Sequence, residues 1–182
     1  VNKRIIASTA GAQLEEIDQV VSFLAHRDKE FAIMHCVGEY PCQREHLELN
    51  QIDFFRHRYK GVPIGFSTHE DPDNFDSIRV AIAQGAMLFE KHVGVATDKY
   101  ALNAYSATPE QAREWLEKAA DTFRMCGVRG ARRSFTEKEM ADLGILYRGA
   151  YAAQDIAKGT KIDLKNTFLA MPNVEGQLVA RQ

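Results

Sequence analysis

The sequence has few cysteines, and they fit no recognised framework. Only three of the 182 residues are cysteine, namely Cys36, Cys42 and Cys126, and no two of them form a Cys-x-x-Cys pair. An odd number of widely spaced cysteines argues against a disulfide framework and against a structural zinc site. We therefore expect reduced thiols, with Cys36 buried in a strand.

Strong charge and long apolar runs are also missing. The formal net charge is −2 at pH 7, and the one short basic cluster, Arg129, Arg132 and Arg133, is typical of a solvated linker. No apolar stretch approaches the roughly 20 residues that span a bilayer, and residues 1–4 lack the apolar core of a signal peptide. These absences predict a cytoplasmic protein with no nucleic-acid and no membrane partner.

The sequence does contain a repeated alternation of short apolar runs and helical patterns. The runs cover residues 5–7, 31–36 and 62–66, and a fourth begins at residue 87. Each is followed by apolar residues at helical spacing: Leu14, Ile17, Val20, Val21 and Leu24; Leu47, Ile52, Phe55 and Tyr59; Phe75, Ile78, Ala81 and Ile82; and Ala112, Trp115, Leu116, Ala119 and Phe123. We expect the last set to form a buried stripe on its helix. Gly85 stands where the third helix would stop, and Thr108 with Pro109 would begin the fourth.

Four β-α units predict an α/β fold, namely half of a (β/α)8 TIM barrel. A whole barrel typically needs about 250 residues, so this chain is too short to close one. A small open sheet of flavodoxin type is the competing architecture, but no glycine- or serine-rich phosphate loop precedes a helix. Farther along, residues 155–159 look like a turn between short strands. We therefore predict a half barrel over residues 1–125, a linker over 126–145 and a small, mainly β module over 146–182.

Polar side chains follow each predicted strand, at the end where parallel α/β sheets bind ligands. They are Ser8 with Thr9, the segment 35–40, Ser67 with His69, and Glu90 with Lys91 and His92. Because side chains alternate along a strand, Ser67 and His69 share one face, and so do Glu90 and His92. Lys91 has the opposite parity and should point towards the helices. Two imidazoles that converge from neighbouring strands predict a divalent-metal site, although a histidine at a strand end is equally common as a hydrogen-bonded core group.

Several of these segments resemble, in the correct order, motifs of the sialic acid synthase (N-acetylneuraminate synthase) family. They are Met34-His35-Cys36-Val37-Gly38-Glu39-Tyr40-Pro41, Gly65-Phe66-Ser67-Thr68-His69, Phe89-Glu90-Lys91-His92 and, before them, Ile6-Ala7-Ser8-Thr9. Residues 151–159 resemble the start of the family's C-terminal SAF module, which is similar to type III antifreeze proteins. The similarity covers nearly the whole chain, which makes it more specific than any single motif.

The resemblance implies an enzyme that condenses phosphoenolpyruvate with an N-acyl hexosamine, such as N-acetylmannosamine, to give a nonulosonic (sialic-type) acid and phosphate. The family's divalent metal, Mn²⁺ or Mg²⁺, would lie on the residues that match its two histidines, His69 and His92. Glu90 would support these catalytic histidines as a carboxylate of the barrel lumen, or else would be a buried hydrogen-bond partner of His92 or Lys91.

The same resemblance implies the residues that bind the substrates. Ser8 and Ser67 match serines that bind the phosphate of phosphoenolpyruvate, a task that suits hydroxyl donors. Tyr40 matches a tyrosine that lines the sugar site.

The sequence departs from the family pattern mainly on the sugar side. Gly38 stands where the family often has an amide, and Thr68 and Leu102 stand where it often has aspartates. In the C-terminal module, Met171 replaces an arginine. These departures leave the acceptor sugar open, and Asn103 is our candidate for the lost polar contact.

The family's early strands, with its general base and its lysines for phosphoenolpyruvate, have no counterpart here, so the resemblance implies that the chain is the second half of the (β/α)8 TIM barrel. We therefore expect a fragment that is inactive alone, taken from a protein that forms a domain-swapped homodimer as other members do. The alternative is a non-catalytic half barrel that binds a sugar or a partner and assembles with another chain or copy.

Overall fold

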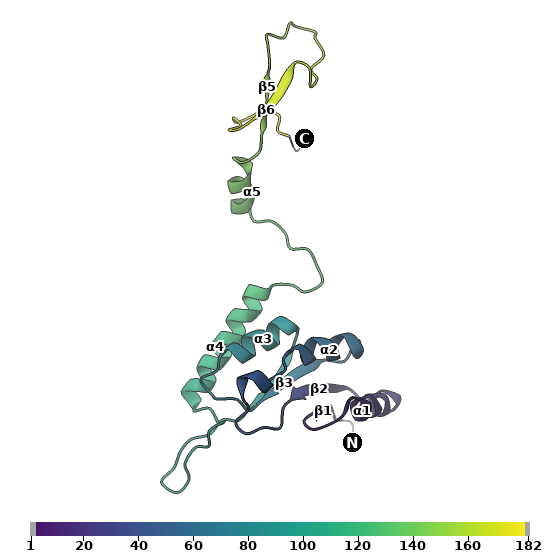
Figure 1. The fold of residues 1–182 in the computed structure, drawn as a ribbon, viewed down its shortest axis with the longest axis vertical. Coiled ribbons are helices and arrows are strands. Elements are labelled where there is room, and N and C mark those ends of the chain that lie inside the picture. Colours follow the sequence, from purple (N-terminus) through teal and green to yellow (C-terminus); the bar gives the residue numbers. More distant parts are fainter. Residues whose placement is uncertain (1–2, 181–182) are drawn as a thin grey trace. The chain divides into compact units, whose positions relative to one another are not determined.

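The computed structural model describes residues 3–180 and divides the chain into two compact units (Figure 1). Unit 1 ends at Arg129 and unit 2 begins at Gly130. Among the described residues, no helix has both the length and the apolar character needed to cross a bilayer.

Unit 1 consists of four β-α units, as the alternation of apolar runs predicted. In chain order they are β1 (Ile5–Ser8) with α1 (Leu14–His26), β2 (Phe31–Cys36) with α2 (Asn50–Arg58), β3 (Ile64–Thr68) with α3 (Asp76–Gln84), and β4 (Leu88–Lys91) with α4 (Pro109–Cys126). A short 3-10 helix, Arg44–His46, precedes α2. β3 begins two residues later than we predicted, because Pro63 has no backbone N–H to contribute to the sheet.

The strands form one parallel sheet in the order β1-β2-β3-β4. Its helices share one face, since a single core cluster joins Ile17 of α1, Ile52 of α2 and Ala81 of α3 to Ile33 and Phe66 of the sheet. A flavodoxin-type sheet would carry helices on both faces and would not keep its strands in sequence order. The arrangement therefore fits part of a TIM barrel, in which every helix lies outside and the other face of the sheet lines the lumen.

The ends of two helices follow the sequence signals. α3 stops at Gly85, whose φ of 107° lies in the left-handed region that glycine adopts without strain. At the start of α4, the Thr108 hydroxyl accepts the Gln111 N–H at 3.2 Å, and the Gln111 side chain accepts the Thr108 N–H at 2.9 Å. Such a cap contributes about 1 kcal/mol, so the loop before α4 ends at a fixed point.

The predicted buried stripe of α4 is only partly correct. Trp115 and Ala119 are buried against α3, but Leu116 is 61% exposed and Phe123 is 48% exposed. α4 is the last helix of unit 1, and it packs on α3 along one side only. Helical spacing identifies an apolar face without revealing how many neighbours cover it.

Unit 2 contains α5 (Glu137–Gly144) and an antiparallel pair formed by β5 (Gly149–Ala152) and β6 (Thr167–Ala170). Residues 155–159 lie in the connection between these two strands, as predicted, and Gly159 has a φ of 92°. The segment that we assigned to the linker, residues 126–145, contains α5.

Candidate functional site

The face of the sheet that points away from the helices carries the predicted polar residues in two neighbouring rows. Ser8 lies beside Met34, and Met34 beside Gly65, in one row. In the next row towards the strand ends, Ser67 lies between Cys36 and Glu90. Because Phe66 packs among the helices, its neighbour Ser67 must point to the opposite face. The alternation of side chains that we predicted is therefore confirmed for β3, and Glu90 of β4, the cross-strand neighbour of Ser67, lies on the same face.

His69 and His92 each lie just beyond the end of a strand, and their side chains meet. The centroids of the two imidazole rings are 5.2 Å apart, with 52° between the ring planes. The backbone carbonyl of His69 accepts the Cys42 N–H at 2.9 Å, and that of His92 accepts the Ala107 N–H, also at 2.9 Å. Each histidine is thus held by a hydrogen bond from a neighbouring loop segment.

The tautomer of His69 follows from its hydrogen bond. The ring is buried, and Nδ1 lies 3.1 Å from the carbonyl oxygen of Val37. Because a carbonyl can only accept, Nδ1 must carry the proton, and Nε2 of the neutral ring keeps its lone pair for another partner. Metal-binding histidines are commonly oriented in this way, by a hydrogen bond from the second ring nitrogen to a backbone carbonyl.

The separation of the two rings fits a shared cation. When two imidazoles bind one metal ion, each at a metal–nitrogen distance of about 2 Å, their ring centroids lie roughly 5 Å apart. The ring centroids of His69 and His92 have nearly this separation. Within residues 3–180, no three His, Cys, Asp or Glu side chains gather closely enough to hold a metal. The pair would therefore supply two nitrogen ligands and leave the remaining positions open, a donor set that suits Mn²⁺ better than Mg²⁺, which prefers oxygen ligands.

Two tyrosines complete an aromatic group around the histidines. The ring centroid of Tyr40 lies 4.2 Å from that of His69 and 5.1 Å from that of Tyr105. The Tyr105 ring is edge-on to the His92 ring, with the centroids 5.1 Å apart. Tyr40 was predicted from the resemblance to the sialic acid synthase family, whereas Tyr105 was missed. The loop contains a second tyrosine, Tyr100, and no spacing in the sequence marks Tyr105 as the one that reaches the histidines.

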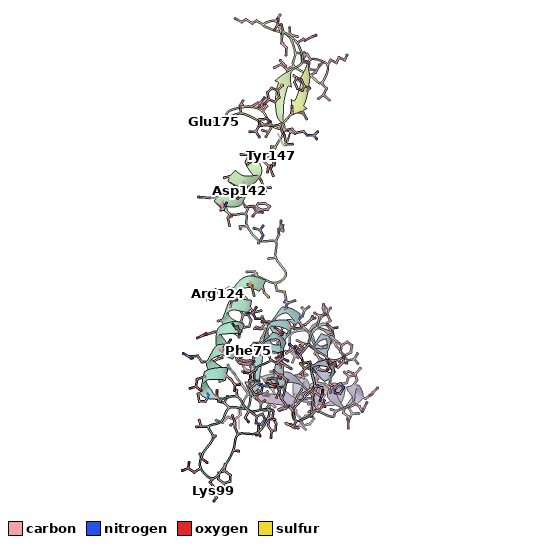
Figure 2. All side chains as sticks on the ribbon, turned by 60° about the vertical axis from the view of Figure 1, so that its left-hand side comes forward. Phe75, Lys99, Arg124, Asp142, Tyr147 and Glu175 are labelled. Carbon is pink, nitrogen blue, oxygen red and sulfur yellow. The ribbon has the colours of Figure 1, made fainter. Side chains whose placement is uncertain are left out.

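The loop between β4 and α4 brings Tyr105 to the site. It leaves the sheet at Val93, extends to a tip near Lys99, and returns to pair Ala107 with Val93 (Figure 2). The Asn103 side-chain oxygen accepts the Tyr105 N–H at 3.2 Å, so it supports the turn that carries this ring. The structure thus gives Asn103 a local role, and its predicted contact with substrate stays a prediction.

The geometry can be compared with known proteins. The NeuB family matches residues 1–130, which include all four strands of the sheet and both histidines. The chain belongs to the NeuB family. This assignment agrees with the resemblance to sialic acid synthases that the strand-end motifs carry.

Named relatives of this NeuB family chain come from sugar-acid and polysaccharide biosynthesis. The spore coat polysaccharide biosynthesis protein SpsE of Bacillus subtilis is 25% identical over 97% of this chain and 51% of its own length. The N,N'-diacetyllegionaminic acid synthase of Campylobacter jejuni is 24% identical over 87% of this chain and 47% of its own length. The chain therefore spans about half the length of the relatives that it matches.

Two crystal structures extend the NeuB comparison. A protein from Chromobacterium violaceum, described as spore coat polysaccharide biosynthesis protein E, is 50% identical with a TM-score of 0.94, over 100% of this chain and 54% of that one. The N-acetylneuraminic acid synthetase of Leptospira borgpetersenii is 25% identical with a TM-score of 0.67, over 76% of this chain and 48% of that one. Both structures are thus named for the biosynthesis of polysaccharide or of sialic acid.

The two charged residues that precede His92, Glu90 and Lys91, lie in different surroundings. Glu90 is exposed on the lumen face, so the reading of Glu90 as a buried partner of His92 or Lys91 is wrong. Lys91 points towards the helix layer, as its parity predicted, and its ammonium lies 3.6 Å from a carboxylate oxygen of the buried Glu70. Whether Glu90 acts in catalysis stays a prediction.

Other buried groups near the strand ends belong to the core. Burial lowers the pKa of His35, whose Nε2 lies 2.7 Å from the Leu47 carbonyl and therefore donates to it. Burial also raises the pKa of the Cys42 thiol to about 11, so this thiol is not a nucleophile near neutral pH. Cys36 is buried in β2 and forms no disulfide, as expected, and its Sγ lies 3.9 Å from Nδ1 of His69.

Two hollows in unit 1 do not contain the histidine pair. One of about 470 Å³ is lined by Thr9, His35, Gly38 and Phe54, between α1 and α2. Another of about 580 Å³ lies at the opposite ends of the strands. The histidines instead lie at the strand ends on the sheet face that a whole barrel would enclose.

Proposed function

We propose that the natural full-length protein condenses phosphoenolpyruvate with an N-acyl hexosamine, in a metal-dependent reaction that yields a nonulosonic acid and phosphate. The observation that carries this proposal is the convergence of His69 and His92, with rings 5.2 Å apart and Nδ1 of His69 fixed on a backbone carbonyl. The names of the NeuB relatives, which include a legionaminic acid synthase, support the class of product.

The proposed reaction joins C3 of phosphoenolpyruvate to the aldehyde carbon of the open-chain sugar. Water adds at C2, and phosphate leaves from that carbon. The divalent ion on His69 and His92 would supply Lewis-acid polarisation of the aldehyde and a positioned water. Two imidazoles and the donor preferences of the ions favour Mn²⁺ over Mg²⁺ for this role.

The hydroxyl groups of Ser8 and Ser67 would bind the phosphate of phosphoenolpyruvate. Both serines lie on the lumen face of the sheet, in neighbouring rows. Hydroxyl groups can donate hydrogen bonds to the phosphate without adding charge to a site that would also hold a divalent metal. The acceptor sugar would lie on the other side of the histidines, against Tyr40 and Tyr105. The C–H face of a sugar is apolar enough to pack on such rings.

The assembly would extend beyond this chain. Unit 2, with its β5–β6 pair, would be the start of an SAF module, and the full-length protein would form a domain-swapped homodimer in the cytoplasm. The resemblance to the sialic acid synthase family supports the SAF module and the domain-swapped homodimer.

Mn²⁺ titration of the natural full-length protein tests the proposal. We expect His69→Ala and His92→Ala each to abolish Mn²⁺ binding and phosphate release from phosphoenolpyruvate. His26→Ala, which changes an exposed histidine at the end of α1, should leave both unchanged. A parent protein without Mn²⁺ affinity would instead favour the alternative, a non-catalytic half barrel that binds a sugar or a partner.

A further inference from the structure

A buried ion pair lies directly behind the histidines, on the helix-facing side of the sheet. The Lys91 ammonium lies 3.6 Å from Glu70 Oε1, and the two side chains are only 3% and 1% exposed. The Ser77 hydroxyl of α3 lies 2.5 Å from the same carboxylate oxygen and donates to it. Both charges are thus held in the layer between the sheet and α3.

The ion pair and the histidines occupy the same two strand ends. Glu70 follows His69 directly in the sequence, and Lys91 directly precedes His92. Lys91 is also the cross-strand neighbour of Thr68, the last residue of β3. Because successive side chains point to opposite faces, the charges meet on the helix side while the imidazoles meet on the lumen side.

Stability alone does not explain a buried ion pair between Glu70 and Lys91. Removing two charges from water is costly, and well-packed apolar side chains of similar volume often serve stability as well or better. The cost is not fully offset by hydrogen bonds, since Thr68 Oγ1, Glu70 Oε2 and Lys91 Nζ have no hydrogen-bond partner among residues 3–180. The best-attested use of such a buried polar contact is to select one register of the elements that it joins.

We infer that Glu70 and Lys91 are positioning residues, which fix the relative height of the ends of β3 and β4 so that His69 and His92 converge. A displacement of one strand end along the other would separate the charges and the rings together. Ser77 holds the carboxylate in place from α3. The inference rests on the proposed function only for the ligand that the two imidazoles share.

The test uses a charge-free replacement of the pair in the natural full-length protein. The single variants Glu70→Gln and Lys91→Met each leave one unpaired charge in the interior and should be strongly destabilised. The double variant Glu70→Gln/Lys91→Met leaves none and should recover much of the lost stability. We expect its Mn²⁺ affinity to stay reduced by about 10–100-fold, the usual effect of losing the residues that orient metal ligands.

Two further variants control for stability and for folding. The double variant Asp18→Asn/Arg58→Met removes a half-exposed ion pair between α1 and the end of α2, and should leave the Mn²⁺ affinity unchanged. Ser77→Ala leaves both charges in place but frees the carboxylate, so it should fold and weaken Mn²⁺ binding a few-fold. Parental Mn²⁺ affinity in Ser77→Ala and in the folded Glu70→Gln/Lys91→Met protein would overturn the inference.

A metal-free measurement separates this inference from the proposed function. Crystal structures of the parent and of Glu70→Gln/Lys91→Met, both without metal, give the separation of the His69 and His92 rings directly. We expect the rings to lie farther apart in the variant than the 5.2 Å of the parent. An unchanged separation of the rings would overturn the positioning role, whether or not the parent binds Mn²⁺. A parent that binds no Mn²⁺ would by itself refute only the proposed function.

Discussion

Replacing Gly65 by alanine would crowd the sheet face that carries the histidines. A Cβ atom at this position would lie 2.8 Å from the Leu88 carbonyl oxygen and 2.2 Å from the Met34 sulfur. The Met34 thioether can rotate away, because its side chain is flexible. The Leu88 carbonyl belongs to the backbone of the neighbouring strand, so β4 would have to move away from β3 by roughly half an ångström to restore normal contact.

The expected cost of Gly65→Ala is about 1–2 kcal/mol. Overpacking of a filled interior costs about 1–3 kcal/mol, and the smaller conformational freedom of alanine in the unfolded chain offsets about 0.4–1 kcal/mol. Because β4 leads directly to His92, the same displacement should weaken Mn²⁺ binding. Urea unfolding and Mn²⁺ titration of the natural full-length protein measure the two effects.

Gly38→Ala is the matched control for this substitution. A Cβ atom on Gly38 would have only the Ala10 side chain near it, at 3.8 Å, so this variant should stay within about 0.5 kcal/mol of the parent. The reasoning about Gly65 is refuted if Gly65→Ala unfolds at the same urea concentration as Gly38→Ala and binds Mn²⁺ as the parent does.

Three further predictions concern the acceptor side and the core. Tyr105→Ala should raise the KM for the acceptor sugar about 2–10-fold and leave the KM for phosphoenolpyruvate unchanged, while Tyr105→Phe stays close to the parent; equal sugar KM values in steady-state kinetics would remove Tyr105 from the site. Gly38→Asn, which restores an amide in open space, should change the preference among acceptor sugars with little change in stability, and an unaltered preference would count against the assignment of this position to the sugar side. Because burial lowers the pKa of His35 below its ordinary 6.5, only the unfolded chain gains a proton as the pH falls through 6.5, so stability is present above that pH and declines below it. Urea unfolding at several pH values should show a smaller decline in His35→Gln, and an identical pH dependence in both proteins would contradict this account.

The parts of the fold that follow from short-range pattern could be read from the sequence. The four β-α units depend on spacing within single segments, and the signals at Gly85 and Thr108 act within one helical turn. The facing of Ser67 follows from alternation along a strand, which needs no knowledge of the neighbouring strands.

The remaining features depend on contacts between distant residues. Tyr105 reaches the histidines through a loop whose course no periodic pattern encodes. The partner of Lys91 is Glu70, 21 positions earlier, and a charge in a sequence carries no sign of whether it will be buried. The exposure of Leu116 reflects the lack of a neighbouring helix in unit 1 beyond α4, which its spacing cannot reveal.

The closed base of the loop between β4 and α4 has a consequence for the diversity of these enzymes. Hydrogen bonds from Ala107 to His92 and from Gly94 to Ala107 tie the two arms of the loop together next to the sheet. The tip near Lys99 can then be lengthened, shortened or rewritten during evolution without disturbing His92 at the base of the loop. The tip of the loop and the histidine at its base can thereby change independently of each other, even though one continuous segment carries both.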